Sequence, residues 1–314
     1  MAQIDLTTGN ITKTMLRFAL PMICGNMLQQ LYNVVDTLIV GRYLGEKALA
    51  AVGSSYTLMV FVTSVILGLC MGSSAFFSMQ FGGRNYDRME KGLFIAFLSI
   101  GAVAVVLNIL VYAGMEGILV FLKVPDEVSP LMEEYLVWIF AGIMATFLYN
   151  FVANLLRAVG NSMVPLCFLG ASAALNIVLD LLFIRGFGWG VGGAAAATVL
   201  SQYVAGIGIF IYYDVKYPQL RVKKENRKWD GAILKELAGL SSLTCLQQSI
   251  MNFGILLVQG LVNSFGPVVM AAFAAAVKVD SFAYAPVQDV GNAFSTYVAQ
   301  NYGAGKEERI RRGM

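Results

Sequence analysis

The sequence predicts an all-α polytopic membrane protein, and its composition and apolar runs support this prediction. Of the 314 residues, 58% are hydrophobic and only 13% are charged, about half the charge content of a soluble domain. The mean hydropathy is +0.69. Most apolar runs are hydrophobic around their whole circumference, which is typical of helices that face lipid. The lipid bilayer is therefore an expected partner of the chain.

Eight apolar runs are long enough to cross a membrane, because a perpendicular helix needs about 20 residues. Several are longer, which predicts tilted helices or helices that extend beyond the bilayer. Pro21 in the first run removes a backbone hydrogen bond and is predicted to act as a hinge. In chain order the runs cover residues 14–41, 52–80, 92–122, 131–156, 162–184, 191–213, 233–264 and 269–300.

Basic residues predict the orientation of these spans. If the N-terminus is cytoplasmic, the segments on that side contain 17 Lys and Arg residues, and the segments on the other side contain four. This asymmetry follows the positive-inside rule and predicts a multi-pass protein of the cell (plasma or inner) membrane with both termini cytoplasmic. The basic stretch "RVKKENRK" then lies in a cytoplasmic linker, so no nucleic-acid partner is expected.

The chain also contains an internal repeat. "LQQLYN" (28–33) recurs as "LQQSIMN" (246–252), and "LGEKALAAVG" (44–53) recurs as "FGPVVMAAFA" (265–274) at an offset of 221 residues. Six spans separate the copies, so the copies share one orientation, as in parallel transporter repeats. We predict a six-helix N-lobe at 1–213, a basic cytoplasmic linker at 214–232, and the first two helices of a pseudo-symmetric C-lobe at 233–314.

The composition argues against enzyme chemistry. The chain has no histidine, and its four cysteines lie separately inside apolar runs, without the spacing of a metal site or redox motif. It has no GxSxG motif, and "GWGVGG" follows a membrane span rather than a strand, so a dinucleotide site is not predicted. We therefore expect no enzyme activity and no cofactor.

Two aspartates lie deep inside apolar runs, Asp36 in the first and Asp180 in the fifth. An aspartate at the centre of a membrane helix costs about 2.5–3.5 kcal/mol on insertion scales, which favours a functional role. Polar partners accompany both, with Gln29 and Tyr32 near Asp36 and Asn176 one turn before Asp180. Such groups could hold a proton or a small hard cation in a cavity. The alternative is that each acid only bonds a neighbouring helix.

Three other runs carry polar side chains whose pattern fits two roles. These side chains could line a cavity, or they could join helices by hydrogen bonds. In the eighth run the charges could also neutralise one another. The positions are Asn150, Asn154 and Arg157 in the fourth run, Gln248, Asn252, Gln259 and Asn263 in the seventh, and Lys278, Asp280 and Asp289 in the eighth.

Three segments resemble a known family. "PMICGNMLQQLYNVVDTLIVGRYLG", "LRAVGNSMVP" and "NIVLDLLFIRGFGWGVGGAAAAT" are similar to the first, fourth-to-fifth and fifth-to-sixth spans of multidrug and toxic compound extrusion (MATE) transporters. The resemblance implies twelve spans in two six-helix lobes with a central substrate cleft. It also implies export driven by the inward flow of protons or sodium ions.

The resemblance also assigns site residues. It implies an N-lobe site for H+ or Na+ at Asp36, Asn176, Asp180 and Thr198. It implies an N-lobe drug cavity at Gln29, Tyr32, Asn150 and Asn154. The family's C-lobe cation site uses an acid in the seventh span, where this sequence has Gln247 and Gln248. A C-lobe site of that kind is therefore not expected.

The resemblance predicts a cation-coupled antiporter that exports small organic, often cationic, molecules by alternating access. Because the family has twelve spans, we expect four further C-terminal helices in the full-length protein. Two alternatives stay open. One is a lipid-linked saccharide flippase of the same superfamily, which would need a cationic cavity for phosphate. The other is a truncated fragment that does not transport.

Overall fold

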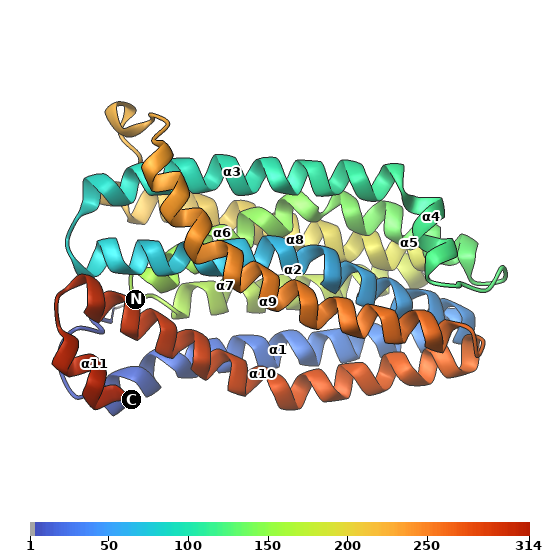
Figure 1. The fold of residues 1–314 in the computed structure, drawn as a ribbon. Coiled ribbons are helices and arrows are strands. Elements are labelled where there is room, and N and C mark those ends of the chain that lie inside the picture. Colours follow the sequence, from blue (N-terminus) through green and yellow to red (C-terminus); the bar gives the residue numbers. More distant parts are fainter. Residues whose placement is uncertain (1–3) are drawn as a thin grey trace.

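The computed structural model describes residues 4–314, apart from the side chains of Lys278 and Ser281. This part of the chain is almost entirely helical and contains no β-strand, which confirms the predicted fold class. The long helices lie side by side in a bundle (Figure 1). The helices are α1 (Ile11–Leu44), α2 (Glu46–Gly82), α3 (Tyr86–Ala113), α4 (Met115–Phe121), α5 (Ser129–Ala141), α6 (Ile143–Ala158), α7 (Met163–Asp180), η1 (Leu181–Gly186), α8 (Gly190–Lys216), η2 (Pro218–Leu220), η3 (Lys224–Asn226), α9 (Gly231–Asn263), α10 (Pro267–Gly303) and α11 (Glu307–Gly313).

Among the described residues, six helices are long and apolar enough to cross a membrane, and the bent pair α5–α6 makes a seventh. The six are α2, α3, α7 with η1, α8, α9 and α10. The first predicted span, α1, has 34 residues but is not among them, because its amides and Asp36 lower its hydropathy. The count of eight spans therefore stays a prediction. α1 is one continuous helix through Pro21, and the hinge role of that proline also stays a prediction.

Two predicted spans are interrupted at glycines. The third run, 92–122, is divided at Gly114 into α3 and α4. The fourth run, 131–156, bends by 45° at Gly142 between α5 and α6. A Cβ atom at Gly142 would lie 2.9 Å from Val199 of α8 and 3.1 Å from the carbonyl oxygen of Ile139, so close packing explains the glycine. The third and fourth predicted runs are therefore each divided between two helices.

Helices α1 and α2 have counterparts in α9 and α10. α1 and α9 run in one direction through the bundle, and α2 and α10 run in the opposite direction (Figure 1). In each pair, the residue directly before the second helix is a glycine of positive φ, Gly45 at 86° and Gly266 at 91°. These glycines are separated by the offset of the sequence repeat. Because glycine has no Cβ atom, it adopts this conformation without strain, and both copies of the repeat use it to make the same turn.

The two halves meet where α2 packs against α10. A Cβ atom on Gly82 would collide with the backbone at Gln300, and a Cβ atom on Gly303 would collide with the backbone at Met79. The repeat offset relates Gly82 to Gly303 and Met79 to Gln300, so these are two symmetric copies of one contact. A pseudo-two-fold axis therefore passes between α2 and α10, as expected for parallel repeats.

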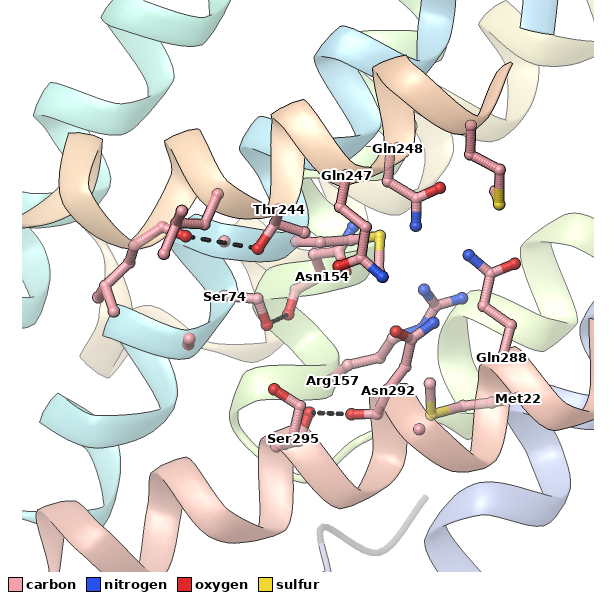
Figure 2. Close-up of a pocket in the computed structure, with 18 of the residues that line it drawn as sticks. Met22, Ser74, Asn154, Arg157, Thr244, Gln247, Gln248, Gln288, Asn292 and Ser295 are labelled. Atoms are coloured by element: carbon pink, nitrogen blue, oxygen red, sulfur yellow. Dashed lines mark hydrogen bonds between the residues drawn. The ribbon is translucent and has the colours of Figure 1, made fainter. Parts of the chain in front are cut away.

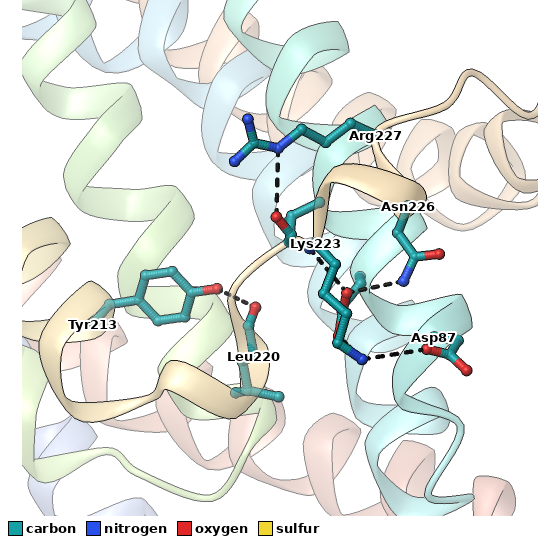
Figure 3. A network of polar contacts seen from close by, with 8 residues as sticks. Asp87, Tyr213, Leu220, Lys223, Asn226 and Arg227 are labelled. Carbon is teal, nitrogen blue, oxygen red and sulfur yellow. Dashed lines mark hydrogen bonds and ion pairs between the residues drawn. The ribbon is translucent and has the colours of Figure 1, made fainter.

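The linker between α8 and α9 is fixed to the start of α3 (Figure 3). The carboxylate of Glu90, only 1% exposed, accepts hydrogen bonds from the backbone N–H of Lys223 at 3.1 Å and the amide of Asn226 at 2.9 Å. The ammonium group of Lys223 lies 3.6 Å from the other carboxylate oxygen. The linker and both ends of the chain lie at the same end of the bundle (Figure 1). Which side of the membrane this end faces, and the division of the chain into 1–213, 214–232 and 233–314, stay predictions.

Candidate functional site

The two buried aspartates meet between α1 and α7. Asp36 is 7% exposed and Asp180 is fully buried. The two carboxyl groups lie close enough to act on each other electrostatically. An ionised carboxylate has no hydrogen-bond donor, so two carboxyl groups can bond only if they hold a proton. Two ionised carboxylates at this separation repel each other, so a proton or a bound cation at the pair would offset their charge.

Asn176 and Thr198 complete the predicted group. When the Asn176 amide is oriented to satisfy its neighbours, its nitrogen donates to Asp180 Oδ2 at 3.0 Å and its oxygen accepts from the Thr198 hydroxyl at 3.2 Å. α7 passes directly after Asp180 into the π-helix η1, a type of turn that is frequent at functional sites. The structure thus brings the four residues together. Their oxygens are of the type that binds hard cations, so they could hold either H+ or Na+.

A small cavity of about 100 Å³ lies beside this group. Gln29 and Tyr32 of α1 and Asn150 of α6 line it, together with Asn176 and Thr198. The Tyr32 side chain lies within electrostatic reach of both carboxyl groups. The cavity has room for a few water molecules, and it is well below the roughly 300–1,000 Å³ of drug-sized sites. The volume of this cavity therefore fits an ion or water molecules but not a drug-sized molecule.

The fourth residue of the predicted drug cavity, Asn154, lies elsewhere. It lines a cleft of about 560 Å³ whose walls come from α1, α2 and α6 on one side and α9 and α10 on the other (Figure 2). The cleft has the volume of a small-molecule site. The structure thus divides the four residues between two cavities, because α6 presents Asn150 and Asn154 to different cavities one helical turn apart. Their role in binding a substrate stays a prediction.

Most of the polar lining of this central cleft comes from α9 and α10. Gln247 and Gln248 of α9 lie opposite Gln288 and Asn292 of α10 (Figure 2). The roles of the two α10 residues were not predicted. A signal was present in the sequence, because Gln288, Asn292 and Ser295 are spaced by four and three residues and so share one helical face.

The polar residues of α9 have two roles. Gln248 lines the cleft, whereas Gln259 and Asn263 are fully buried against α2. The Gln259 amide donates to the Ser54 hydroxyl at 2.8 Å, and the Ser54 hydroxyl donates to Asn263 Oδ1 at 2.9 Å. For these two residues the interhelical hydrogen-bonding interpretation is correct.

The charged residues of the eighth predicted span do not form one cluster among the described side chains. Asp289 is buried and accepts a hydrogen bond of 2.6 Å from the amide of Asn26 on α1. Asp280 is exposed on the surface of the bundle. The side chain of Lys278 lies outside the described residues.

Sequence reasoning missed several residues near the carboxyl pair. Tyr135 of α5 lies within electrostatic reach of Asp36 and Asp180, but a single tyrosine in an apolar run gives no signal for a site. Gln202 lines the small cavity and accepts a hydrogen bond of 2.9 Å from Thr146. Its position one turn after Thr198 on α8 could have indicated this role.

A helical membrane bundle with parallel repeats, a buried carboxyl pair and a polar cleft between its halves has the features of a secondary transporter. The family model of MatE, the multidrug and toxic compound extrusion transporters, matches residues 21–182 and 244–314. The chain therefore belongs to the MatE family.

Individual relatives agree with this assignment. The chain is 33% identical over 311 residues to the probable multidrug resistance protein YpnP of Bacillus subtilis, covering 99% of this chain and 69% of that protein. It is 28% identical over 310 residues to the probable multidrug resistance protein NorM of Thermotoga maritima, covering 96% of this chain and 65% of that protein. The chain thus spans about two thirds of the length of these relatives.

The fold is also similar to that of a solved structure. A multidrug resistance MATE family transporter of the MOP superfamily, in its outward-facing conformation, superimposes with a TM-score of 0.89 at 23% sequence identity. The match covers all of this chain and 70% of the other. At this identity the similarity supports the fold alone.

Proposed function

We propose that the full-length protein exports small organic molecules by alternating access, driven by the inward movement of protons or sodium ions. The observation that carries this proposal is the close approach of two buried carboxyl groups, Asp36 and Asp180, beside a small polar cavity. The names of the relatives, which are called multidrug resistance proteins, support export as the activity. We also propose that the protein lies in the cell membrane with both termini cytoplasmic.

The carboxyl pair can couple an ion to a conformation because its charge depends on what it holds. Without a proton or cation, two adjacent carboxylates repel each other and favour separation of α1 from α7. With a proton or Na+ bound, the two helices can pack as they do in this structure. The side chain of Asn176 orients Asp180 through a hydrogen bond and accepts one from Thr198 on α8. Entry of one such ion is also driven by the membrane potential, at about 2.3 kcal/mol per charge per 100 mV.

Two helices connect the ion site to the central cleft. α1 carries Asp36 in the ion site and Met22 in the cleft. α6 carries Asn150 in the small cavity and Asn154 in the cleft. A movement of either helix that follows proton or Na+ binding therefore changes the wall of the cleft. In this mechanism, ion binding and substrate binding compete through the positions of α1 and α6.

The test replaces each carboxyl group by an amide in the full-length protein. Asp36→Asn keeps the shape and the hydrogen bonding but removes the ionisable charge. We expect Asp36→Asn and Asp180→Asn to abolish gradient-driven efflux of rhodamine 123 and fluorescein from proteoliposomes, with unchanged membrane insertion. The exposed Asp126→Asn variant is the matched control and should export normally. Dissipating the proton and sodium gradients separately identifies the coupling ion. Export by Asp36→Asn at the wild-type rate would show that the carboxyl pair only joins helices.

A further inference from the structure

The central cleft has an unexpected charge. Among its described lining residues, Arg157 of α6 is the only charged one, and no carboxylate faces the cleft. The remaining lining consists of amides, hydroxyl groups and apolar side chains, the last including Met22, Met71 and Met251. The expectation of often cationic substrates came from the family resemblance, and the acids Asp36 and Asp180 lie outside this cleft.

The guanidinium of Arg157 is not neutralised by direct contact with an acid. In the part of the chain that the structure describes, Arg157 takes part in no ion pair. Its Nε atom is buried without a hydrogen-bond partner among those residues. Asp289 is within electrostatic reach, but its Oδ1 atom accepts from Asn26 rather than from Arg157. A partly buried guanidinium without a partner is costly, and carboxylate or phosphate groups match its fork of donors.

The surroundings of Arg157 fit an anionic group. In Figure 2 its guanidinium lies in the cleft beside the side-chain amides of Gln288 and Asn292. Each amide NH2 can donate two hydrogen bonds, so the three side chains place several donors at one end of the cleft. The methionines supply adaptable apolar surface for varied organic bodies.

We propose that the central cleft binds amphipathic substrates through an anionic group, a carboxylate, sulfonate or phosphate, that is held by Arg157 with Gln288 and Asn292. The inference rests on the proposed export function and narrows its substrate class. The apolar body of the substrate packs against Met22, Met71 and Met251. Binding needs no ion gradient, so it can be tested independently of coupled transport.

The test compares two dyes that share a ring system but differ in charge. Fluorescein is anionic and rhodamine 123 is cationic, and binding of each to the full-length protein in phosphatidylcholine nanodiscs is measured by fluorescence anisotropy. We expect the wild type to bind fluorescein more tightly. Arg157→Gln should weaken fluorescein binding by roughly 10- to 100-fold, the effect of losing a charged hydrogen-bonding group, and should leave rhodamine 123 binding unchanged or stronger. Arg42→Gln, at an exposed arginine outside the cleft, should change neither.

A competing explanation is that Arg157 only offsets the charge of Asp289. The double variant Arg157→Gln/Asp289→Asn removes both charges. If it regains fluorescein binding, Arg157 acts on Asp289 and the proposal is wrong. If the loss persists, Arg157 acts on the ligand. A wild type that prefers rhodamine 123, or an Arg157→Gln variant that loses both dyes equally, would also overturn the proposal.

Two further measurements complete the test, and the first uses only the unmodified protein, so it does not depend on how a variant folds. Naphthalene-1-sulfonate should displace fluorescein, and the uncharged 1-naphthol should displace it much more weakly. Equal displacement by the two compounds would contradict a site that selects its ligand by a negative charge. A second set of nanodiscs, which contain the anionic lipid phosphatidylglycerol, then shows whether the anionic group that binds Arg157 belongs to a lipid headgroup or to a free anion. Weaker fluorescein binding there, in the wild type but not in Arg157→Gln, supports the proposal with a lipid headgroup as ligand. Unchanged binding supports it with a free anion as ligand.

Discussion

One added methyl group at Gly303 should weaken the contact between the two halves of the protein. A Cβ atom there would collide with the backbone at Met79, which cannot rotate away as a side chain could. Overpacking of this kind costs about 1–3 kcal/mol. Alanine also favours a helix over glycine by about 1 kcal/mol. Gly291 lies on the same helix with open space around its Cβ position, so Gly291→Ala has the propensity gain without the collision.

The difference between Gly303→Ala and Gly291→Ala therefore isolates the collision, and we expect it to be about 1–3 kcal/mol in the free energy of unfolding. The measurement is unfolding of the full-length protein in mixed micelles by increasing sodium dodecyl sulfate, followed by circular dichroism. Gly82→Ala adds a methyl at the symmetric contact, against Gln300, and should cost a similar amount. Equal stability of Gly303→Ala and Gly291→Ala would mean that α2 and α10 do not approach closely at this point.

Three further outcomes are expected. Asn263→Ala removes the acceptor of the Ser54 hydroxyl between α9 and α2 and should lower the free energy of unfolding by about 0.6–2 kcal/mol, measured by the same titration. Glu90→Gln removes the buried charge that holds the linker and should speed tryptic cleavage there several-fold, whereas Glu225→Gln, at an exposed linker position, should not. Reporter fusions at Pro218 and at the C-terminus should both give cytoplasmic signals, and an external signal from either contradicts the proposed topology.

The helical fold could be predicted from the sequence because apolar length and charge asymmetry are set by the bilayer rather than by packing. The repeat was recognisable because both copies need the same features, among them Gly45 and Gly266 at the same turn. The breaks at Gly114 and Gly142 could not be predicted. A glycine inside an apolar run does not by itself indicate a bend, because α2 stays continuous at Gly68, where α9 approaches closely, whereas the chain bends by 45° at Gly142.

The two acids of the proposed ion site could be found in the sequence for a different reason. Placing a carboxyl group in the bilayer costs free energy, and such residues are rare in membrane helices. Asp36 and Asp180 could therefore be recognised as candidate site residues without knowledge of their neighbours. Amides give no such signal, because Gln248 and Gln259 look alike in the sequence. One lines the cleft and the other joins two helices. Their roles depend on which side chains the partner helix presents, and that is a tertiary property.

The separation of the two cavities explains why an ion and an organic molecule need not compete for the same atoms. The carboxyl pair lies beside a cavity of about 100 Å³, which excludes a drug-sized body, while the cleft of about 560 Å³ has no carboxylate in its described lining. Hydrogen bonds along α6 lead from one to the other. The Asn154 amide donates to the carbonyl oxygen of Asn150 at 2.9 Å, and the Asn150 amide donates to that of Thr146 at 2.8 Å. Coupling through α6 would therefore act by moving a helix rather than by exchanging a ligand, and this allows the cleft to bind an anionic group while the ion site binds a cation.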